Sequence, residues 1–354
     1  MNCYIHIPFC DSICFYCDFC RVVSSKKNQY LDALELEIKT HGVHDIDTLY
    51  FGGGTPSSLS IDQLTRLCSF FKPYLNNSYE WTIECNPDSL DLEKIKLFKE
   101  MGVNRISLGA QTFDNTLLKQ IGRRHSAQDV FRCIKELRQE GIENISIDLI
   151  YGLPNQTINQ LNSDLSMFLQ LDLPHISIYS LQIEENSVFG KKNVQPIDEE
   201  LEEQMYDLIC QRLSEYNHYE ISSFCKEGKH SMHNLCYWSD NDFIGFGCGA
   251  SGKENNVRYD HVFNINEYIN NPLAKTWIEE SREEQMFDAI MMSLRTSFGL
   301  DIDKFNKKYQ TDFYSRYENV IKKYISFFDC TKKRIVCTQK GRDILNTILI
   351  DFME

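Results

Sequence analysis

The chain has 354 residues, 42% of them hydrophobic and 25% charged, so it is long enough for two globular domains with sizeable cores. Its net charge of −14 argues against binding to a nucleic-acid backbone, which needs a basic surface. No stretch approaches the ~18 consecutive apolar residues of a membrane-spanning helix.

The first half of the chain alternates short apolar runs with amphipathic stretches. The apolar runs predict six β-strands, at residues 4–7, 48–51, 81–85, 105–108, 146–150 and 175–179. Helical patterns lie between them, at residues 27–40, 61–74, 92–101, 127–140 and 158–169, and Gly42, Gly102 and Gly141 lie where helix C-caps are expected. Repeated βα units predict a parallel α/β sheet whose functional groups lie at the carboxyl ends of the strands, with too few units for a closed eight-fold barrel.

Three cysteines, Cys10, Cys14 and Cys17, follow the first predicted strand with the spacing C-x3-C-x2-C. Thiolates are the usual ligands of iron–sulfur clusters, and three of them leave one iron of a four-iron cluster open. Zinc and inert core thiols are the alternatives, but structural zinc takes four ligands, commonly as two spaced pairs, and no second pair follows at a typical distance. Fourteen cysteines could indicate a secreted disulfide scaffold, but they are scattered over a large chain whose start lacks a basic and apolar leader, which favours a reducing, cytoplasmic location.

These cysteines lie in and beyond a segment Y-x-H-I-P-F-C that begins at Tyr4, and an aromatic residue precedes Cys17. The segment resembles the radical S-adenosylmethionine (SAM) superfamily, in the branch of oxygen-independent coproporphyrinogen III dehydrogenases and related heme chaperones. The resemblance implies a [4Fe–4S] cluster on the three cysteines, with SAM chelated at the open iron and cleaved to a 5′-deoxyadenosyl radical. It also implies a partial (β/α)6 barrel at residues 1–184, a barrel extension at 185–279, and a small winged-helix-like domain at 280–354.

Residues at the ends of the second and third strands are candidate SAM ligands. A glycine triplet at residues 52–54 also fits a tight strand-to-helix turn, and Glu84 alone is as readily a surface residue. The resemblance implies that SAM is bound by Tyr4, Gly53, Gly54, Thr55 and Glu84.

Gln111, Arg123 and Asp148 lie after or within the fourth and fifth predicted strands. A carboxylate inside an apolar strand needs a partner, so an Asp148–Arg123 ion pair is the structural alternative. By resemblance, these three residues and Ser180 correspond to contacts with a second SAM molecule in the dehydrogenase.

Beyond residue 179 the pattern predicts a helix at 199–216, a strand at 219–224 and a basic loop with Lys226 and Lys229. The following segment H-N-L-C-Y-W starts at His233, and on physical grounds it is a packing corner in a loop. It resembles a motif of the heme chaperones, which implies that His233 binds heme in a pocket with Tyr237 and Trp238, while the two lysines meet the propionates. Competing iron ligands lie nearby, namely Cys225, His230 and Cys236.

Residues 247–252 match G-x-G-x-x-G, but a turn-like polar stretch follows instead of a helix, so a Rossmann site is rejected. The resemblance implies that this segment closes over the first SAM near Ser251. The remaining patterns predict helices at 283–295, 301–308, 314–327 and 339–352 and a strand at 334–337. One face of the last helix fits a domain core, with partner or membrane contact as the alternative; it carries Ile344, Leu345, Ile348, Leu349 and Phe352.

Two functions compete. The dehydrogenase has an extension before its Y-x-H motif and a further cysteine two residues past the triplet, whereas here Phe19 takes that position and Cys20 lies one residue beyond. The resemblance therefore favours a heme chaperone without coproporphyrinogen dehydrogenase activity, with heme, hemoprotein clients (membrane-associated ones included) and an electron-donor protein as partners. The residues for a second SAM keep the dehydrogenase, a SAM-dependent oxidative decarboxylase of heme biosynthesis, as the alternative. A purely structural iron–sulfur protein would leave the glycine loop, Glu84 and Gln111 unexplained.

Overall fold

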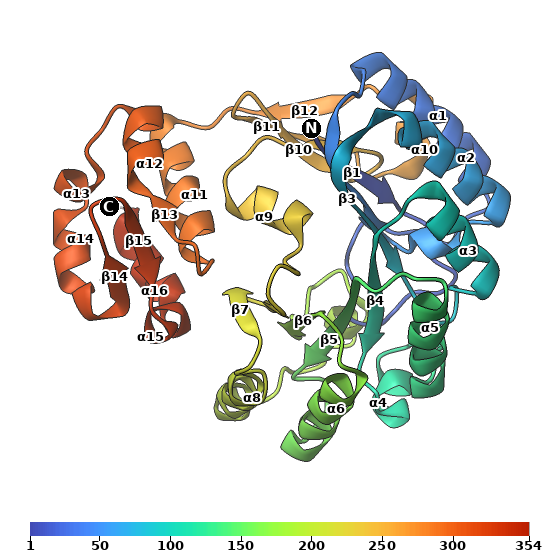
Figure 1. Ribbon diagram of the computed structural model, residues 1–354, viewed down its shortest axis with the longest axis horizontal. Helices are drawn as coiled ribbons and strands as arrows, with labels where there is room; N and C mark the ends of the chain where they lie inside the picture. The colour runs from blue at the N-terminus through green and yellow to red at the C-terminus, as the bar shows by residue number, and fades with distance from the viewer. Residues whose placement is uncertain (354) are drawn as a thin grey trace.

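A nine-stranded sheet forms the centre of the computed structural model, which describes residues 1–353 (Figure 1). Its strand order is β7-β8-β6-β5-β4-β3-β2-β1-β9, so the first six strands are parallel neighbours in chain order. These strands are β1 (Asn2–Ile7), β2 (Ile46–Gly53), β3 (Leu75–Cys85), β4 (Arg105–Gln111), β5 (Ile145–Tyr151) and β6 (His175–Ser180). All six predicted strands are confirmed.

Helices cover one face of this sheet (Figure 1). The main ones are α1 (Lys27–His41), α2 (Ile61–Phe71), α3 (Leu92–Met101), α5 (Ala127–Gln139), α6 (Ile158–Leu171) and α8 (Glu199–Arg212). The predicted helices are confirmed, and Gly42, Gly102 and Gly141 have positive φ at or beside their C-caps, as predicted. These strands and helices confirm the predicted α/β architecture with a partial barrel of six parallel strands.

The two faces of the six strands differ in polarity. The face under the helices is apolar and fully buried, with Ile5, Phe51, Ile83, Leu108, Ile147 and Ile176. The residues that alternate with these are largely polar. Tyr4, Tyr50, Glu84 and Asp148 are partly buried, Ser107 is buried and Tyr179 is exposed. Parallel sheets covered by helices on both faces are apolar on both. We call the face opposite the covering helices the inner face. Its polar side chains indicate that it makes polar contacts.

The edges of the sheet come from the second half of the chain. β9 (Ile244–Phe246) pairs in parallel with β1. At the other edge, β8 (Ser223–Cys225) pairs antiparallel with β6, and β7 (Asn217–Glu220) pairs with β8. The prediction of one strand at 219–224 is wrong, because the chain turns back between Glu220 and Ser223 to form this hairpin.

The H-N-L-C-Y-W segment is also not the predicted loop. It forms helix α9 (Met232–Trp238), which lies on the side of the sheet opposite the covering helices (Figure 1). Ser231 caps the helix by accepting a hydrogen bond from the Asn234 amide. Both carboxylate oxygens of Glu80, in β3, accept bonds from the Met232 and His233 amides. A tertiary partner therefore satisfies the helix N-terminus.

After the Gly-rich segment comes a three-stranded antiparallel sheet of β10 (Ser251–Glu254), β11 (Val257–His261) and β12 (Lys275–Ile278). A strand follows residues 247–250 instead of a helix. The rejection of a Rossmann site is confirmed.

The C-terminal part has a hydrophobic core of its own. It contains α11 (Arg282–Leu294), α12 (Ile302–Tyr309) and a small sheet in the order β13 (Leu300–Asp301), β15 (Arg334–Cys337), β14 (Phe328–Cys330). The two continuous helices predicted at 314–327 and 339–352 are wrong. They break into α13 (Phe313–Arg316) with α14 (Glu318–Lys323), and α15 (Gln339–Asp343) with α16 (Leu345–Phe352). The apolar face of α16 lies in this core, as predicted.

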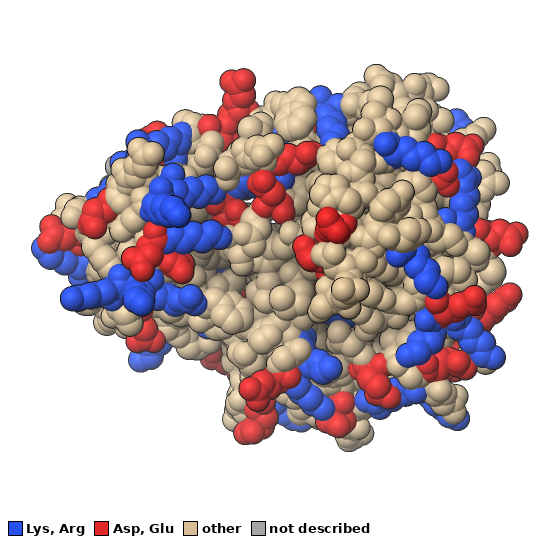
Figure 2. Space-filling model, turned by 45° about the horizontal axis from the view of Figure 1, so that its top comes forward, with Lys and Arg blue, Asp and Glu red and all other residues tan. Residues whose placement is uncertain are grey.

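Within residues 1–353, none of the helices combines the length and apolar character needed to cross a membrane. On the face shown in Figure 2, acidic and basic side chains are interspersed, without a continuous basic area.

Candidate cluster and cofactor site

The cysteine loop between β1 and α1 is closed by a hydrogen bond of its own and is tied to two other parts of the chain. The Cys10 amide donates to the Val22 carbonyl (3.1 Å), which closes the loop on itself. The Phe15 amide donates to the Ile121 carbonyl (3.0 Å), and the Phe15 carbonyl accepts from the Phe189 amide (2.9 Å). The loop is thus fixed above the carboxyl ends of β1 and β2, where the sequence places the site.

Polar donors approach two of the three thiols. Arg123 Nη1 lies 3.5 Å from Cys14 Sγ, and Thr55 Oγ1 lies 3.5 Å from Cys10 Sγ. Hydrogen bonds to sulfur are one of the ways in which proteins tune an iron–sulfur cluster. Burial raises the pKa of Cys10, and it raises the pKa of Cys17 to about 11, so cluster binding has to displace protons from these thiols.

The donor set fits a cluster better than a single ion. Among residues 1–353, no three His, Cys, Asp or Glu side chains are placed to hold one metal ion. A zinc site requires such a convergence on one point. The spacing of the three cysteines favours a cluster, because it lacks the second pair typical of a structural zinc site.

A chain of hydrogen bonds connects the cysteine loop to β3 and β4. Arg123 Nη2 donates to Asn86 Oδ1 (2.7 Å) and to the Gly109 carbonyl (2.6 Å). Asn86 Nδ2 in turn donates to Thr55 Oγ1 (3.0 Å), which neighbours Cys10. Asn86 was not predicted as a site residue, although it directly follows a predicted strand, where functional groups are expected.

The glycine loop after β2 is held against the cysteine loop. The Gly54 amide donates to the Ile7 carbonyl (2.9 Å), and a Cβ on Gly54 would lie 2.8 Å from the Pro8 carbonyl carbon. Gly53 has a φ of 109°, and its amide donates to Glu84 Oε2 (3.2 Å). Glycine is required at both positions. The backbone of this loop is thereby brought beside the cysteines.

Glu84 lies on the inner face, where the Tyr50 hydroxyl donates to its Oε1 (2.8 Å). Burial raises the pKa of Glu84 to about 7. On the neighbouring strand β1, His6 Nδ1 lies 3.1 Å from the Tyr4 hydroxyl and His6 Nε2 lies 2.8 Å from the Cys20 carbonyl. His6 thus has a positioning role that was not predicted, although His6 alternates with Ile5 and so shares one strand face with Tyr4.

The side chains of Gln111 and Arg123 meet over Gly109, and Asp148 lies opposite Gly109 on the neighbouring strand β5. A Cβ on Gly109 would lie 2.9 Å from Gln111 Nε2 and 3.4 Å from Arg123 Nη2, and Asp148 is paired with Gly109 in the sheet. Gln111 has a φ of 66° at an irregularity in this pairing, a conformation that non-glycine residues adopt rarely and often at functional sites.

The Asp148–Arg123 ion pair is not among the ion pairs formed within residues 1–353. Both oxygens of Asp148 instead accept from the Ser107 hydroxyl (3.1 and 2.9 Å), and burial raises the pKa of this carboxyl.

Two predicted site residues lie apart from this group. Ser180 ends β6, and its hydroxyl donates to Glu202 of α8. Ser251 is exposed, and its hydroxyl donates to Asp260 within its own hairpin. In the Gly-rich segment, it is Cys248 and Gly249 that approach the cysteine loop, through Cys20.

His233 lies in α9 at the amino-terminal end of the parallel strands, away from the cysteine loop. Its side chain is fully buried and stacks on Tyr50, with ring centroids 5.1 Å apart. Its Nδ1 lies 2.8 Å from Thr48 Oγ1, and its Nε2 lies 2.7 Å from the Tyr237 hydroxyl. Burial lowers the pKa of His233 to about 3. The imidazole is therefore neutral, and both of its nitrogens have protein partners.

The basic loop lies at the same end of the sheet as α9. Lys226 forms an ion pair with Asp172 (2.5 Å), and Lys229 is exposed. Trp238 is half-buried at the end of α9.

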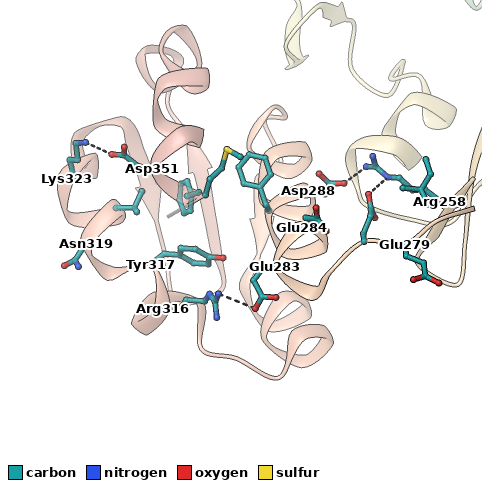
Figure 3. Close-up of a pocket in the computed structure, with 16 residues that line it drawn as sticks. Arg258, Glu279, Glu283, Glu284, Asp288, Arg316, Tyr317, Asn319, Lys323 and Asp351 are labelled. Atoms are coloured by element: carbon teal, nitrogen blue, oxygen red, sulfur yellow. Dashed lines mark hydrogen bonds and ion pairs between the residues drawn. The ribbon is translucent and has the colours of Figure 1, made fainter.

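A cavity of about 960 Å³ between β12 and the C-terminal helices does not include any of these residues. Several of its charged side chains pair with one another, including Arg258 with Asp288 and Arg316 with Glu283 (Figure 3).

Comparison with known proteins agrees with this geometry. The sequence model of the radical SAM superfamily matches residues 4–168, and that of the HemN C-terminal domain matches residues 281–344. The heme chaperone HemW of Lactococcus lactis is 38% identical over 99% of this chain and 96% of its own length. The chain belongs to the radical SAM superfamily. A second relative, the heme chaperone HemW of Bacillus subtilis, is 39% identical over 90% of this chain and 89% of its own.

A solved structure of this superfamily shares the fold over the whole chain. Coproporphyrinogen III oxidase (HemN) from Escherichia coli, a radical SAM enzyme, superimposes with a TM-score of 0.86 at 22% identity, covering 99% of this chain and 89% of its own. Membership in the superfamily implies a [4Fe–4S] cluster and SAM as cofactors, and the donors around Cys10, Cys14 and the glycine loop fit them.

Proposed function

We propose that the protein is a heme chaperone, which binds heme and delivers it to hemoproteins. The observation that carries this proposal is the similarity to HemW chaperones, which extends over 99% of this chain and 96% of the Lactococcus relative. Similarity over the full length of both chains supports a shared function of the whole protein and goes beyond a shared cofactor domain. The proposed partners are heme, client hemoproteins and an electron-donor protein, in the cytoplasm with peripheral contact to membranes that hold clients.

The proposed cofactor site uses the chain's own groups in three ways. Cys10, Cys14 and Cys17 hold the cluster, which when bound supplies one-electron chemistry. The glycine loop and Glu84 hold SAM beside it, together with Tyr4. Ser251 can join them only after its hydroxyl leaves Asp260 and its exposed hairpin moves toward the cysteine loop. Gln111, Arg123 and Asp148 lie on the adjoining part of the inner face, whereas Ser180 must first release Glu202 of α8. Arg123 and Asn86 keep the cysteine loop in place through their hydrogen bonds to Gly109 and Thr55.

His233 is the proposed heme ligand, and heme iron can reach its imidazole only after a local rearrangement. Imidazole is a normal axial ligand of heme iron. Because the ring is buried and its Nε2 is bonded to Tyr237, α9 must move and this hydrogen bond must break before iron can bind. Lys226 and Lys229, at the same end of the sheet, are the proposed partners of the propionates, and Lys226 must then release Asp172.

Heme titration followed by Soret absorbance tests this proposal. His233→Ala should lose the shifted Soret band, whereas His230→Ala, the matched control in the adjacent loop, should keep it. Tyr237→Phe removes the competing hydroxyl and should tighten heme binding by about fivefold, the equivalent of one hydrogen bond of ~1 kcal/mol. Unchanged spectra and affinity in both His233→Ala and Tyr237→Phe would exclude His233 as the ligand.

The second candidate function is coproporphyrinogen dehydrogenation. It is favoured by one observation, the approach of the Gln111 and Arg123 side chains over Gly109, which pairs with Asp148 in the sheet. The turnover assay that separates it from the chaperone function is described in the Discussion.

A further inference from the structure

Two cysteines outside the cluster triplet lie side by side. Cys20 ends the cysteine loop and Cys248 lies in the Gly-rich segment, 228 residues later, and their Sγ atoms are 3.6 Å apart. Cys20 is half-buried, whereas Cys248 is fully buried. One thiol of the pair is thus open to small oxidants, and the other is reached through it.

The surrounding backbone is built to bring these sulfur atoms together. Gly249 has a φ of 75°, and a Cβ there would lie 2.5 Å from Cys20 Cβ, so any other residue would push Cys20 away. His6 Nε2 lies 2.8 Å from the Cys20 carbonyl and holds its backbone. The Cys248 amide donates to the Tyr30 hydroxyl (3.0 Å), which in turn donates to the His6 carbonyl (2.6 Å). Both cysteines are therefore anchored to the same histidine of β1.

The chemistry of the pair is asymmetric. A disulfide has an S–S distance of ~2.05 Å, so the sulfur atoms must approach by about 1.5 Å, which side-chain rotation can provide. The hydrogen bond with Cys248 lowers the pKa of Cys20 below its ordinary value, and His6 and Arg21 act in the same direction. Thiolates are the species that peroxides oxidise.

We propose that Cys20 and Cys248 form a peroxide-sensitive dithiol that closes to a disulfide. Cys20 sulfur attacks the peroxide, the O–O bond breaks, and Cys20 becomes a sulfenic acid while hydroxide leaves. The Cys248 sulfur then attacks the Cys20 sulfur, the S–O bond breaks, and water leaves as the S–S bond forms. Two thiols lose two electrons in total and the peroxide is reduced to two waters; a thiol reductant reverses the reaction.

The disulfide would fasten the end of the cysteine loop to the Gly-rich segment. An effect of this link on cofactor binding rests on the proposed cluster and SAM site. Formation of the disulfide itself does not depend on that proposal. The test below measures sulfur chemistry alone, so its failure is distinguishable from a failure of heme binding.

The experiment uses the full chain with its cluster reconstituted anaerobically. Hydrogen peroxide is added in stoichiometric amounts in one arm and glutathione disulfide in another, free thiols are alkylated in acid, and peptides are mapped by mass spectrometry without reduction. We expect a linked pair of peptides with Cys20 and Cys248, lost on adding dithiothreitol. Cys20 should be oxidised about tenfold or more faster than the buried Cys68.

Matched variants make the result decisive. Cys248→Ser should accumulate a dimedone-reactive sulfenic acid on Cys20, and Cys20→Ser should leave Cys248 reduced, both with unchanged iron content before oxidation. Cys225→Ser is the control and should form the same linked peptides as the wild type. Pairing of Cys20 with a cluster cysteine, or a free Cys248 once Cys20 is fully oxidised, would overturn the proposal.

Discussion

Glu84 shows how position on the inner face sets the charge of a single residue. Burial raises its pKa to about 7, and the neighbouring Asp148 carboxyl acts in the same direction. Both oxygens of an ionised carboxylate accept hydrogen bonds, so they can accept from the ribose hydroxyls of SAM. When the carboxyl is protonated, one of its oxygens carries a hydrogen and donates instead. The protonation of Glu84 therefore controls how well it can hold SAM in the proposed site.

We expect SAM affinity to rise by about tenfold from pH 6 to pH 8 if only the ionised form of Glu84 binds, with a midpoint near 7. Because the folded pKa lies above the unfolded value, the unfolded chain loses this proton first, and Glu84 lowers the free energy of unfolding as pH rises from 4.5 through 7. Anaerobic equilibrium dialysis of SAM measures the effect. Glu84→Gln should bind weakly and without this pH dependence; a persistent dependence would assign it to another group, such as Asp148.

The residues of the candidate site were predictable to different degrees. The spacing of the cysteines and glycines is local in sequence, so Cys10, Cys14, Cys17, Gly53 and Gly54 were identified without structural information. The grouping of Gln111, Arg123 and Asp148 was suggested by resemblance alone. Asn86 and His6 were missed because their roles are hydrogen bonds to residues distant in sequence, such as Arg123 and Cys20.

At the scale of elements, local patterns predicted the parallel strands and their helices well. Each strand carries enough apolar residues to be recognised, and each helix has its own amphipathic period. The pattern failed at α9, whose N-terminus depends on Glu80, about 150 residues away in β3. It failed again where the last helices break near Tyr317 and Ile344, because those breaks are set by packing within the C-terminal core.

The C-terminal domain contacts the chain at the carboxyl end of helix α9. Asp240, just after α9, pairs with Lys308 of α12 (2.6 Å) and with Lys253 of β10. Its side chain is only 12% exposed, so removing its charge leaves nearly buried Lys253 unpaired. This contact links the proposed heme-binding helix to the C-terminal domain.

We expect Asp240→Asn to loosen α9 and to lower the free energy of unfolding by about 2–3 kcal/mol, since breaking one side of a buried pair is costly. Hydrogen–deuterium exchange should become faster for the α9 amides in particular. Asp242→Asn, in the same loop, is the control because Asp242 accepts from the Asn255 and Asn256 amides and does not pair with α12. Equal exchange of α9 in both variants would show that the Asp240 pairs do not hold the helix.

On the scale of the whole molecule, the two proposed sites lie at opposite ends of the same strands. The cysteine loop lies over their carboxyl ends, and His233 lies at their amino ends. The rings of Tyr4 and Tyr50 pack against His233, with the three ring centroids 5.1 to 6.5 Å apart. Tyr4 also contacts His6, which in turn contacts the Cys20 carbonyl, so this cluster of rings connects His233 to the cysteine loop. Such an arrangement suits a carrier whose cofactor site and cargo site are separate.

The same separation underlies the last prediction, that the protein does not convert coproporphyrinogen III. A dehydrogenase must hold the porphyrinogen next to the SAM that reacts with it. Phe19, which takes the position of the dehydrogenase's further cysteine, is 67% exposed, and Cys20 is turned toward Cys248. The cysteine loop therefore lacks a fourth thiol of the dehydrogenase type.

Product chromatography under strict anaerobiosis, with SAM and a reductant, checks this prediction. A true dehydrogenase run in parallel shows that the assay works, and 5′-deoxyadenosine is measured in the same samples. We expect no tetrapyrrole product beyond the background of the reaction without protein, whether or not SAM is cleaved, because the expected defect lies in placing the substrate. Multiple turnovers of coproporphyrinogen III would instead favour the enzyme, and they would assign Gln111, Arg123 and Asp148 a role in that reaction.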